Sequence, residues 1–592
     1  MKSLFQQRFD EFQQEASSFQ KQYNQWAVTR AVLFLSFAVL AYFLYVNYDV
    51  LFLLIFLLVA IGIFLGTVVK HLAIKEKRDK ARLLASLNQD EINRLESVFT
   101  RPETGLNFAN NQHFYTADLD IFGKHSIYQL LNRTHTYVGA KELASWLQGT
   151  VETTTILERQ EAIETLKAKI DWRQNFEVSA MMIEEVAEPV DKLLAWNNSP
   201  ANTKIQEPLF QYGKYLAFVT VPLLLTWMVG LLPIGWVIVA LGINGMILKG
   251  VFEEIGRVLA QTSQVEGALK AYSQLADLIT KEDFENQALK NLQARVAGAS
   301  EAILNLGKIT GRMANRTNPF FMFFVGLPTL WDIWYFNKLE NWKASHQQDL
   351  PQWLATIAQF EALNSLAGYA FANPSFVVPH IQEEGILLKA NALGHPMIRS
   401  AKRVCNDIAL EGIGKTIIIT GSNMSGKSTF QRTVAINTVL ALAGAVVCAD
   451  EFECSRMQVF TSMRTQDSLE EDTSSFYAEL KRLEQLLIRV KEEGRIPTLY
   501  FLDEILKGTN SKDRHDGAKA LMLQLHKANA SGFISTHDVE LGDEFASQGF
   551  VENVSFASEV QEGRLVFDYK IKQGVCHSFN ASQLMRQIGI EM

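Results

Sequence analysis

The first thirty residues alternate apolar and polar positions with a helical period. Apolar side chains recur at steps of four and three, which predicts one helix with a continuous apolar seam made of Phe5, Phe9, Phe12, Ala16, Phe19, Tyr23 and Trp26. The opposite face is rich in glutamine and is not strongly basic. Packing of the seam against another helix or the body of the protein is therefore favoured over attachment to a membrane surface.

Two apolar runs without a polar face follow, at residues 31–46 and 51–69, and only four residues separate them. A membrane span needs about 20 such residues, so the pattern predicts a transmembrane hairpin. Basic residues flank it on both sides, at Lys2, Arg8, Lys21 and Arg30 before it and at Lys70, Lys75, Lys77, Arg78, Lys80 and Arg82 after it. This bias places both ends in the cytoplasm and predicts a multi-pass protein of the inner (cytoplasmic) membrane.

A second candidate hairpin covers residues 215–232 and 234–248 and turns at Pro233. It is shorter and is interrupted by Pro222, Gly230 and Gly242, but spanning is favoured over a buried helical pair. Whether the chain has two spans or four stays open. A third run, residues 320–336, contains Pro328 and Asp332, which favours packing in a core or an interface.

The pattern changes at residues 416–420, an apolar run typical of a buried parallel strand, which leads into a glycine-rich loop and a helix. The loop, together with Thr429, predicts a triphosphate cradle made of Gly421, Ser422, Asn423, Met424, Ser425, Gly426, Lys427, Ser428 and Thr429. Lys427 would reach the β- and γ-phosphates, and Ser428 would hold Mg²⁺. The alternative is an ordinary glycine-rich turn between a strand and a helix.

Two further apolar strands end in polar residues. Residues 498–502 lead into Asp503 and Glu504, which suit a Mg²⁺ ligand and a base that activates water against the γ-phosphate. Residues 533–535 lead to His537, which could sense that phosphate. ATP hydrolysis is therefore expected; the alternatives are two solvated acids and a structural histidine.

In order and spacing, these segments resemble the ATPase domain of the MutS mismatch-repair family, a branch of the ABC ATPases. The resemblance rests on residues 420–429, on Asp503-Glu504-Ile505 with residues 508–511, and on Ser535-Thr536-His537. Residues 467–480 resemble the segment that reaches the partner's ATP. The resemblance implies a homodimer in which Ser474 completes the other subunit's site, and a double-stranded DNA partner that is mismatched, damaged or branched.

The likeness extends upstream, and it has departures. Residues 118–122, 130–134 and 143–147 resemble the start of the family's helical core, and His395-Pro396 and Asn406 fit as well. No domain that fits the family's N-terminal mismatch reader precedes Asp118, so direct mismatch recognition is in doubt. The family's usual arginine after the second motif is replaced here by Leu506-Lys507.

Composition adds limits to this interpretation. The 592 residues carry a formal charge of −8, so any DNA contact must come from local basic patches. Four scattered cysteines show no metal-ligand spacing and fit a reducing cytoplasm. We expect a multidomain α and α/β chain, with the hairpin in residues 1–85, a helical MutS-like core and lever in 86–390, and a P-loop ABC-type ATPase domain in 391–592.

Two other functions stay open. One is a membrane-tethered ATPase that acts on lipid or protein without DNA, which the net acidic charge and the missing mismatch reader favour. The other is an ABC-type transporter, which is disfavoured because no Leu-Ser-Gly-Gly-Gln signature lies between Gly426 and Asp503 and four possible spans are few for a pathway.

Overall fold

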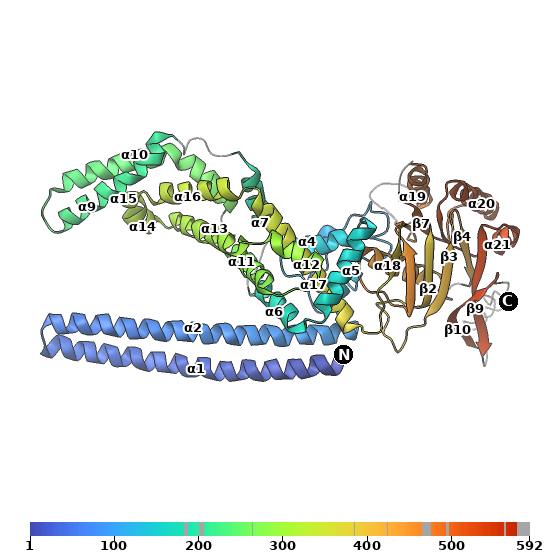
Figure 1. Ribbon diagram of the computed structural model, residues 1–592, viewed down its shortest axis with the longest axis horizontal. Coiled ribbons are helices and arrows are strands. Elements are labelled where there is room, and N and C mark those ends of the chain that lie inside the picture. The colour runs from blue at the N-terminus through green and yellow to red at the C-terminus, as the bar shows by residue number, and fades with distance from the viewer. Residues whose placement is uncertain are drawn as a thin grey trace.

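The computed structural model describes residues 1–182, 187–200, 207–262, 265–383, 385–422, 424–464, 475–492, 496–561 and 564–576. Within them, the chain is mostly helical, and its sheets lie in the C-terminal part. An α/β unit occupies one end of the molecule, and two long helical arms extend from the other side of a helical body (Figure 1).

The first arm is an antiparallel pair of helices, α1 (Lys2–Asn47) and α2 (Val50–Leu95). The predicted seam packs inward: Phe5 is 2% exposed and lies 5.9 Å from the ring of Phe371. Further along, the rings of Tyr23 and His71 are 4.2 Å apart. The packing use of the seam is confirmed.

The far half of this arm consists of the two apolar runs, and their side chains are largely exposed. Leu58, for example, is 76% exposed. Three described helices are long and apolar enough to cross a membrane, namely α1, α2 and α10 (Ile234–Thr262). The first two coincide with the predicted hairpin.

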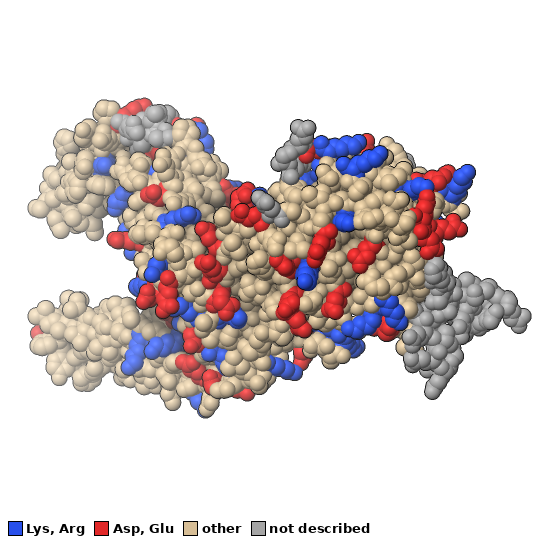
Figure 2. Space-filling model, turned by 45° about the vertical axis from the view of Figure 1, so that its right-hand side comes forward, with Lys and Arg blue, Asp and Glu red and all other residues tan. Residues whose placement is uncertain are grey.

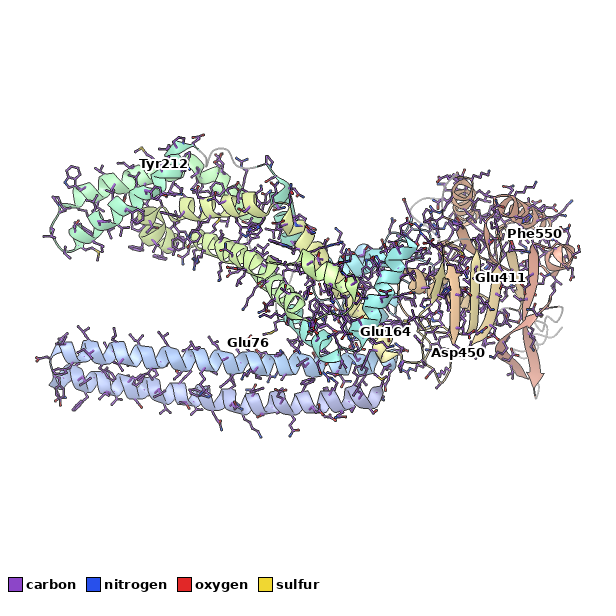
Figure 3. The ribbon with its side chains drawn as sticks, viewed as in Figure 1. Glu76, Glu164, Tyr212, Glu411, Asp450 and Phe550 are labelled. Carbon is purple, nitrogen blue, oxygen red and sulfur yellow. The ribbon has the colours of Figure 1, made fainter. Side chains whose placement is uncertain are left out.

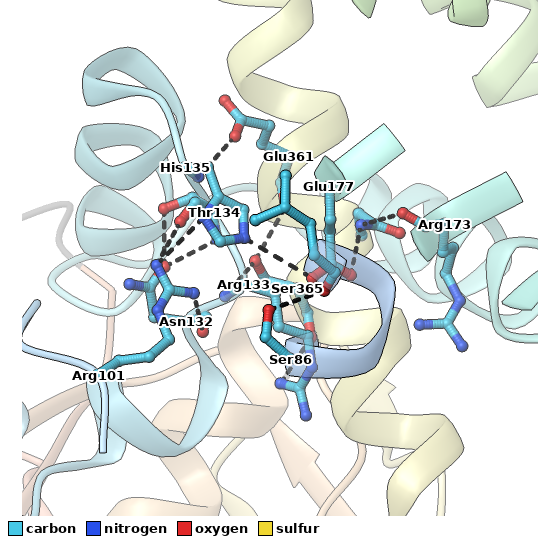
Figure 4. A network of polar contacts seen from close by, with 12 residues as sticks. Ser86, Arg101, Asn132, Arg133, Thr134, His135, Arg173, Glu177, Glu361 and Ser365 are labelled. Carbon is cyan, nitrogen blue, oxygen red and sulfur yellow. Dashed lines mark hydrogen bonds and ion pairs between the residues drawn. The ribbon is translucent and has the colours of Figure 1, made fainter. Parts of the chain in front are cut away.

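The near end of α2 is built into the helical body rather than ending at residue 85. Glu91 pairs with Arg133 at 2.7 Å and with Arg94 at 2.6 Å, and all three side chains are buried. Asn88 and Gln174 exchange amide hydrogen bonds of 3.3 and 3.0 Å. Arg133 belongs to a wider polar network with Glu177, Glu361 and Ser365 (Figure 4). The first arm is therefore fixed to the body by buried polar contacts.

The helical body surrounds the long helix α17 (Asp349–Ala372). Phe360, Leu363 and Leu366 are at most 2% exposed. The remaining helices of the body are η1 (Leu106–Phe108), α3 (Ile127–Leu131), α4 (Tyr137–Trp146), α5 (Thr153–Lys167), α6 (Ile170–Met181) and α12 (Gln287–Arg295).

The second arm leaves the body through α7 (Ala187–Asn198), α11 (Glu266–Lys281), α13 (Ala299–Ala314) and α16 (Trp331–His346). Tyr272 and Leu306 are among its buried side chains. Its far part is made of α8 (Pro208–Gly213), η3 (Lys214–Leu216), α9 (Ala217–Met228), α10, η4 (Asn315–Thr317), α14 (Pro319–Phe321), η5 (Met322–Gly326) and α15 (Leu327–Thr329). In Figure 3, Tyr212 marks the second arm and Glu76 marks α2 of the first.

The third apolar run divides between two environments. Leu330, Ile333 and Phe336 are fully buried, as packing in a core requires. Phe320 and Phe324 are 76% and 69% exposed, so the first half of the run does not pack in the core. The difference arises because a turn at Leu330, whose φ is 52°, separates α15 from α16.

The C-terminal unit holds two sheets. A six-stranded sheet has the order β10-β9-β4-β8-β7-β6, and its strands pair in parallel except β9 with β10. These strands are β4 (Thr416–Gly421), β6 (Gln458–Ser462), β7 (Thr498–Asp503), β8 (Ser531–Thr536), β9 (Val551–Gln561) and β10 (Arg564–Gln573). All three strands predicted around the chemical motifs, β4, β7 and β8, are present.

A four-stranded sheet, β1-β5-β2-β3, lies beside it and is made of β1 (His380–Gln382), β2 (Leu387–Leu393), β3 (Asn406–Glu411) and β5 (Glu451–Ser455). The helices of the unit are α18 (Lys427–Ala443), α19 (Ser475–Val490), α20 (Ser511–Lys527) and α21 (Val539–Phe545). Helix α18 is buried along most of its length, which fixes the loop before it.

Candidate functional site

The glycine-rich loop joins the carboxyl end of β4 to the first turn of α18. All six residues of β4 are buried, and α18 begins at Lys427. Gly421 and Gly426 have φ values of 149° and 106°. A Cβ on Gly421 would lie 2.6 Å from the backbone oxygen of Phe556, so glycine is required there. Loop and helix have the arrangement that suits a bound phosphate.

The Lys427 side chain folds back over this loop. Its Nζ donates to the carbonyl oxygens of Gly421, at 2.9 Å, and Ser422, at 3.1 Å, and lies 3.6 Å from Oε1 of Glu504. Burial lowers the pKa of Lys427, and attraction by Glu504 and Asp503 opposes that shift. The predicted phosphate lysine and the two predicted acids are therefore brought together.

Glu504 is the centre of the charge cluster. Its Oε1 lies 2.9 Å from Nε2 of His537, and its Oε2 lies 2.8 Å from Nζ of Lys507. The hydrogen bond from His537 is the largest cause that lowers the pKa of Glu504 well below its usual range, and Lys507 adds to it. The carboxylate is therefore ionised at neutral pH, as a base that accepts a proton from water requires.

The backbone holds Glu504 in a conformation that side-chain-bearing residues seldom adopt. Its φ is 49°, and its N–H donates to the carbonyl oxygen of Ser535 at 3.0 Å. Ser535 Oγ also donates to the carboxylate of Asp503. Because β8 is the neighbour of both β4 and β7, it fixes the two motifs relative to each other. A strained residue held this firmly is typical of a functional position.

A cavity of about 440 Å³ opens beside the loop. The loop and its helix contribute Ser422, Met424 and residues 426–430 to its lining, and Glu504 lies at its inner wall. The lining also includes His395, Val404, Phe556 and Tyr569. The cavity thus brings aromatic residues and the phosphate-binding loop together around a volume in the range of small-molecule sites.

Two residues of the cavity lining, His395 and Tyr569, have further features that bear on the site. Burial lowers the pKa of His395 to about 4, so its imidazole is neutral at pH 7. The Tyr569 carbonyl accepts from Nδ2 of Asn406 at 3.0 Å, and the Tyr569 ring would lie 3.1 Å from a Cβ on Gly426. Asn406, noted in the sequence, therefore positions β10 over the loop.

The described residues also fit ATP and Mg²⁺ by their unpaired polar atoms. The buried hydroxyls of Ser422 and Ser425 have no hydrogen-bond partner among the described residues. Ser428 lines the cavity at the first turn of α18, and Asp503 lies at the end of β7 with one oxygen bonded to Ser535. Hydroxyl and carboxylate oxygens are the ligands that Mg²⁺ prefers.

Three contributors were not singled out from the sequence. Lys507 was noted only as a departure from the family, yet it pairs with Glu504. Tyr569 lies more than 140 positions from the loop, and no local pattern indicates its role. Glu479 of α19 accepts a hydrogen bond from the backbone N–H of Leu506, and burial raises its pKa. Two predicted residues, Asn423 and Ser474, lie outside the described residues.

The C-terminal unit is similar to known proteins. Residues 417–589 match MutS domain V. The chain is 28% identical over 245 residues to the DNA mismatch repair protein MutS of Listeria monocytogenes serotype 4b, which covers 40% of this chain and 28% of that protein. It is 31% identical over 247 residues to MutS of Chloroflexus aurantiacus, covering 40% and 25%, and 30% identical over 250 residues to endonuclease MutS2 of Geobacillus thermodenitrificans, covering 42% and 31%.

These matches show a likeness between the C-terminal unit and the MutS family, in particular its domain V. They span about a quarter to a third of the length of the curated relatives. The helical body and both arms lie largely outside the matched segment, so the likeness concerns the C-terminal unit.

Proposed function

We propose that this chain is a MutS-like ATPase that uses ATP hydrolysis as a conformational switch while it is held at a membrane, and that it acts on DNA. The observation that carries the ATPase proposal is the contact of Glu504 with both Lys427, at 3.6 Å, and His537, at 2.9 Å, at the inner wall of the cavity. The base, the phosphate lysine and the sensor histidine meet at one point.

In this proposal, each residue has one task. Lys427 exchanges its contacts with the loop carbonyls for the β- and γ-phosphate oxygens. Ser428 and Asp503 would hold Mg²⁺, which neutralises charge on those oxygens. Glu504 orients a water and accepts its proton, and the arrival of the γ-phosphate draws Lys427 and His537 away from the carboxylate.

The link from Glu504 to the rest of the molecule passes through Leu506 and Lys507. The Leu506 N–H is bonded to Glu479 on α19, the helix that directly follows Ser474. A change in the contacts of Glu504 is therefore transmitted to the segment that, by resemblance, reaches the partner subunit. We propose a homodimer in which Ser474 caps the partner's ATP.

DNA is the proposed substrate because the relatives that match this unit are named for mismatch repair or as an endonuclease of the MutS2 type. Membrane attachment is supported by the length and apolar composition of α1 and α2. Together they describe a repair or recombination switch that works next to the inner membrane, with the ATPase domain in the cytoplasm.

The test is ATP turnover by the full chain in nanodiscs, with no DNA and with duplex, mismatched and branched DNA, across a salt series. The full chain is needed because α2 is part of the body up to Leu95. Stimulation that weakens as salt rises supports DNA as substrate. Turnover that no DNA changes at low salt contradicts it.

A second candidate has a specific observation in its favour. Both arms end in exposed apolar side chains rather than in basic ones, as Leu58 and Phe320 illustrate. An ATPase that moves lipid or a membrane protein would have such ends. In the same assay, turnover that depends on lipid composition but not on DNA would select this function.

A further inference from the structure

The second arm ends in a surface that has no charged residue. We call it the arm tip and define it as residues 217–248, which contain α9 and the first part of α10, together with α14 and η5. No Asp, Glu, Lys or Arg lies in residues 217–248 or 317–331. Many of its large side chains are more than half exposed, including Phe218, Leu231, Trp236, Met246, Phe320 and Phe324. A patch of this size and composition indicates a partner that is itself apolar.

Two polar side chains of the arm tip donate their hydrogen bonds within it. Asn244 is 1% exposed, and its Nδ2 donates to the carbonyl oxygen of Leu327 at 3.0 Å and to Oγ1 of Thr220 at 3.2 Å. Thr226 donates to the carbonyl oxygen of Pro222, the proline inside α9, at 2.9 Å. The Asn244 Oδ1 has no hydrogen-bond partner among the described residues, whereas the donors of Asn244 and Thr226 are satisfied internally, as a hydrocarbon environment demands.

Basic and aromatic side chains surround the base of the arm tip. We call this set the belt: Lys214, Tyr215, Lys249, Arg312, Trp334, Tyr335 and Lys338. The Lys214 ammonium lies 5.3 Å from the ring centres of Tyr215 and Trp334. Arg312 donates to the Tyr335 hydroxyl at 3.1 Å. Tyrosine, tryptophan and basic residues gather where a bilayer meets water, and the cations match anionic headgroups.

The first arm has the same arrangement of apolar end and basic, aromatic base. Lys70 lies 4.7 Å over the ring of Trp26, and Arg78 lies 4.5 Å over that of Tyr23. From Val50 to Lys70, α2 rises by about 30 Å at 1.5 Å per residue, which is the thickness of a bilayer's hydrocarbon core. The hairpin therefore supplies a reference for where the membrane would lie.

Both apolar ends point in the same direction. The turn between α1 and α2 and the turn between α9 and α10 lie at the end of the molecule opposite the α/β unit (Figure 1). Figure 2 shows two projecting lobes at that end, with few charged side chains on the visible face. One flat bilayer can therefore take up both.

We propose that the arm tip is embedded in the same bilayer as the N-terminal hairpin, with the belt at the cytoplasmic headgroups. From Ile234 to Lys249, α10 rises by about 23 Å, so the tip passes the bilayer midplane. The protein then has two separate membrane-embedded segments in one bilayer, the N-terminal hairpin and the arm tip. Relative movement of the two arms acts on the lipid between them. This inference does not depend on the ATPase or DNA proposals.

The test places an environment-sensitive fluorophore on single cysteines in the full chain. The background is Cys405→Ser, since the other three native cysteines are buried. The tip variants are Met246→Cys and Phe323→Cys, Leu58→Cys reports the hairpin, and Leu157→Cys is a matched exposed apolar position on α5. Vesicles of phosphatidylcholine and phosphatidylglycerol carry lipids that have a spin label at mid-chain.

We expect the spin-labelled lipid to quench the fluorophore at 246, 323 and 58 several-fold more than at 157, and aqueous iodide to show the reverse order. Iodide quenching at 246 and 323 equal to that at 157 overturns the proposal. Protection from iodide without quenching by lipid also overturns it, because a second copy or another protein would then cover the tip. Lack of lipid quenching at 58 removes the reference bilayer and overturns it as well.

The belt has its own test in the Phe323→Cys protein. Lys214→Glu with Lys249→Glu should lower lipid quenching at 323 several-fold on vesicles with phosphatidylglycerol and leave quenching at 58 in a matched Leu58→Cys protein unchanged. Lys281→Glu with Lys290→Glu, two exposed positions on α11 and α12 away from the belt, is the control pair. An equal effect of both pairs would contradict a headgroup contact at the belt.

Discussion

At the scale of single residues, Glu504 is the group on which the proposed chemistry depends. It is held by a cation on each side, Lys427 and Lys507, and by His537. Such a carboxylate is ionised, and the same contacts keep it from a productive water until phosphate competes for them. The substitutions below separate these two roles.

Replacement of the base should trap the nucleotide. In Glu504→Gln, the amide cannot accept a proton, so ATP turnover should fall by about 10²- to 10⁴-fold while ATP binding is retained. Turnover and filter retention of labelled ATP measure this. Lys427→Ala is the matched control and should lose retention as well. A Glu504→Gln protein that turns over ATP at the parent rate would show that another group is the base.

Lys507 should affect the acidic limb of the pH profile. The side chain helps to lower the pKa of Glu504, so Lys507→Ala should raise that pKa and move the acidic limb of kcat to higher pH. Lys507→Arg keeps the charge and should leave the limb in place. The measurement is kcat against pH for the three proteins. Identical limbs in the parent and the alanine variant would remove Lys507 from the site.

Much of the site follows from sequence because each motif is local. Residues 421–429, Asp503-Glu504 and His537 each end a strand, and parallel strands bring their carboxyl ends to one edge. Lys507 and Tyr569 could not be assigned in this way, since their contacts depend on a left-handed turn at Leu506 and on the pairing of β10 with β9. Such contacts have no periodic signal.

At the scale of elements, the joint between α2, α6 and α17 buries several charged side chains, among them Glu91, Arg173 and Glu361. Burial is the largest cause that raises the pKa of Glu177 to about 7, with repulsion from Glu91 second. Glu177 accepts from Asn364 at 3.2 Å and lies 3.8 Å from His135, whose pKa burial lowers. The joint therefore responds to pH in the physiological range.

Glu177→Gln should isolate this response. Because the folded pKa of Glu177 is raised, its contribution to stability is fully present below about pH 4.5 and is lost as pH rises to about 7, which amounts to about 3 kcal/mol. His135 acts in the opposite sense below pH 6.5, but both proteins contain it. As pH rises from 5 to 8, the denaturation midpoint of the variant should therefore rise relative to that of the parent. Midpoints that change with pH in the same way in both proteins would contradict the raised pKa of Glu177.

Element boundaries illustrate what periodicity predicts well and what it does not. The spacing of Phe5, Phe12 and Phe19 identified an inward face because residues spaced by three and four positions lie on the same side of a helix. The same reasoning could not separate Phe320 from Phe336, since an apolar residue looks alike in sequence whether protein or lipid covers it. Only the turn at Leu330 distinguishes them.

At the scale of the whole molecule, the proposed switch requires two chains. ATP should convert the Glu504→Gln protein from a single copy of 66.8 kDa to a pair, after correction for the detergent micelle. Light scattering with and without ATP measures the mass. Lys427→Ala should stay single under both conditions. A constant mass for Glu504→Gln would show that ATP does not bring two copies together.

The stretch of α2 beyond Lys70 sets a distance. About 25 further residues, up to Leu95, form a continuous helix of about 38 Å that ends inside the body. On the proposed membrane attachment, this helix would fix the distance between the lipid surface and the helical body, and the body would hold the nucleotide cavity at a constant height. Substrates would then have to come within that distance of the membrane, and the search for them would be confined to a thin layer beneath the bilayer.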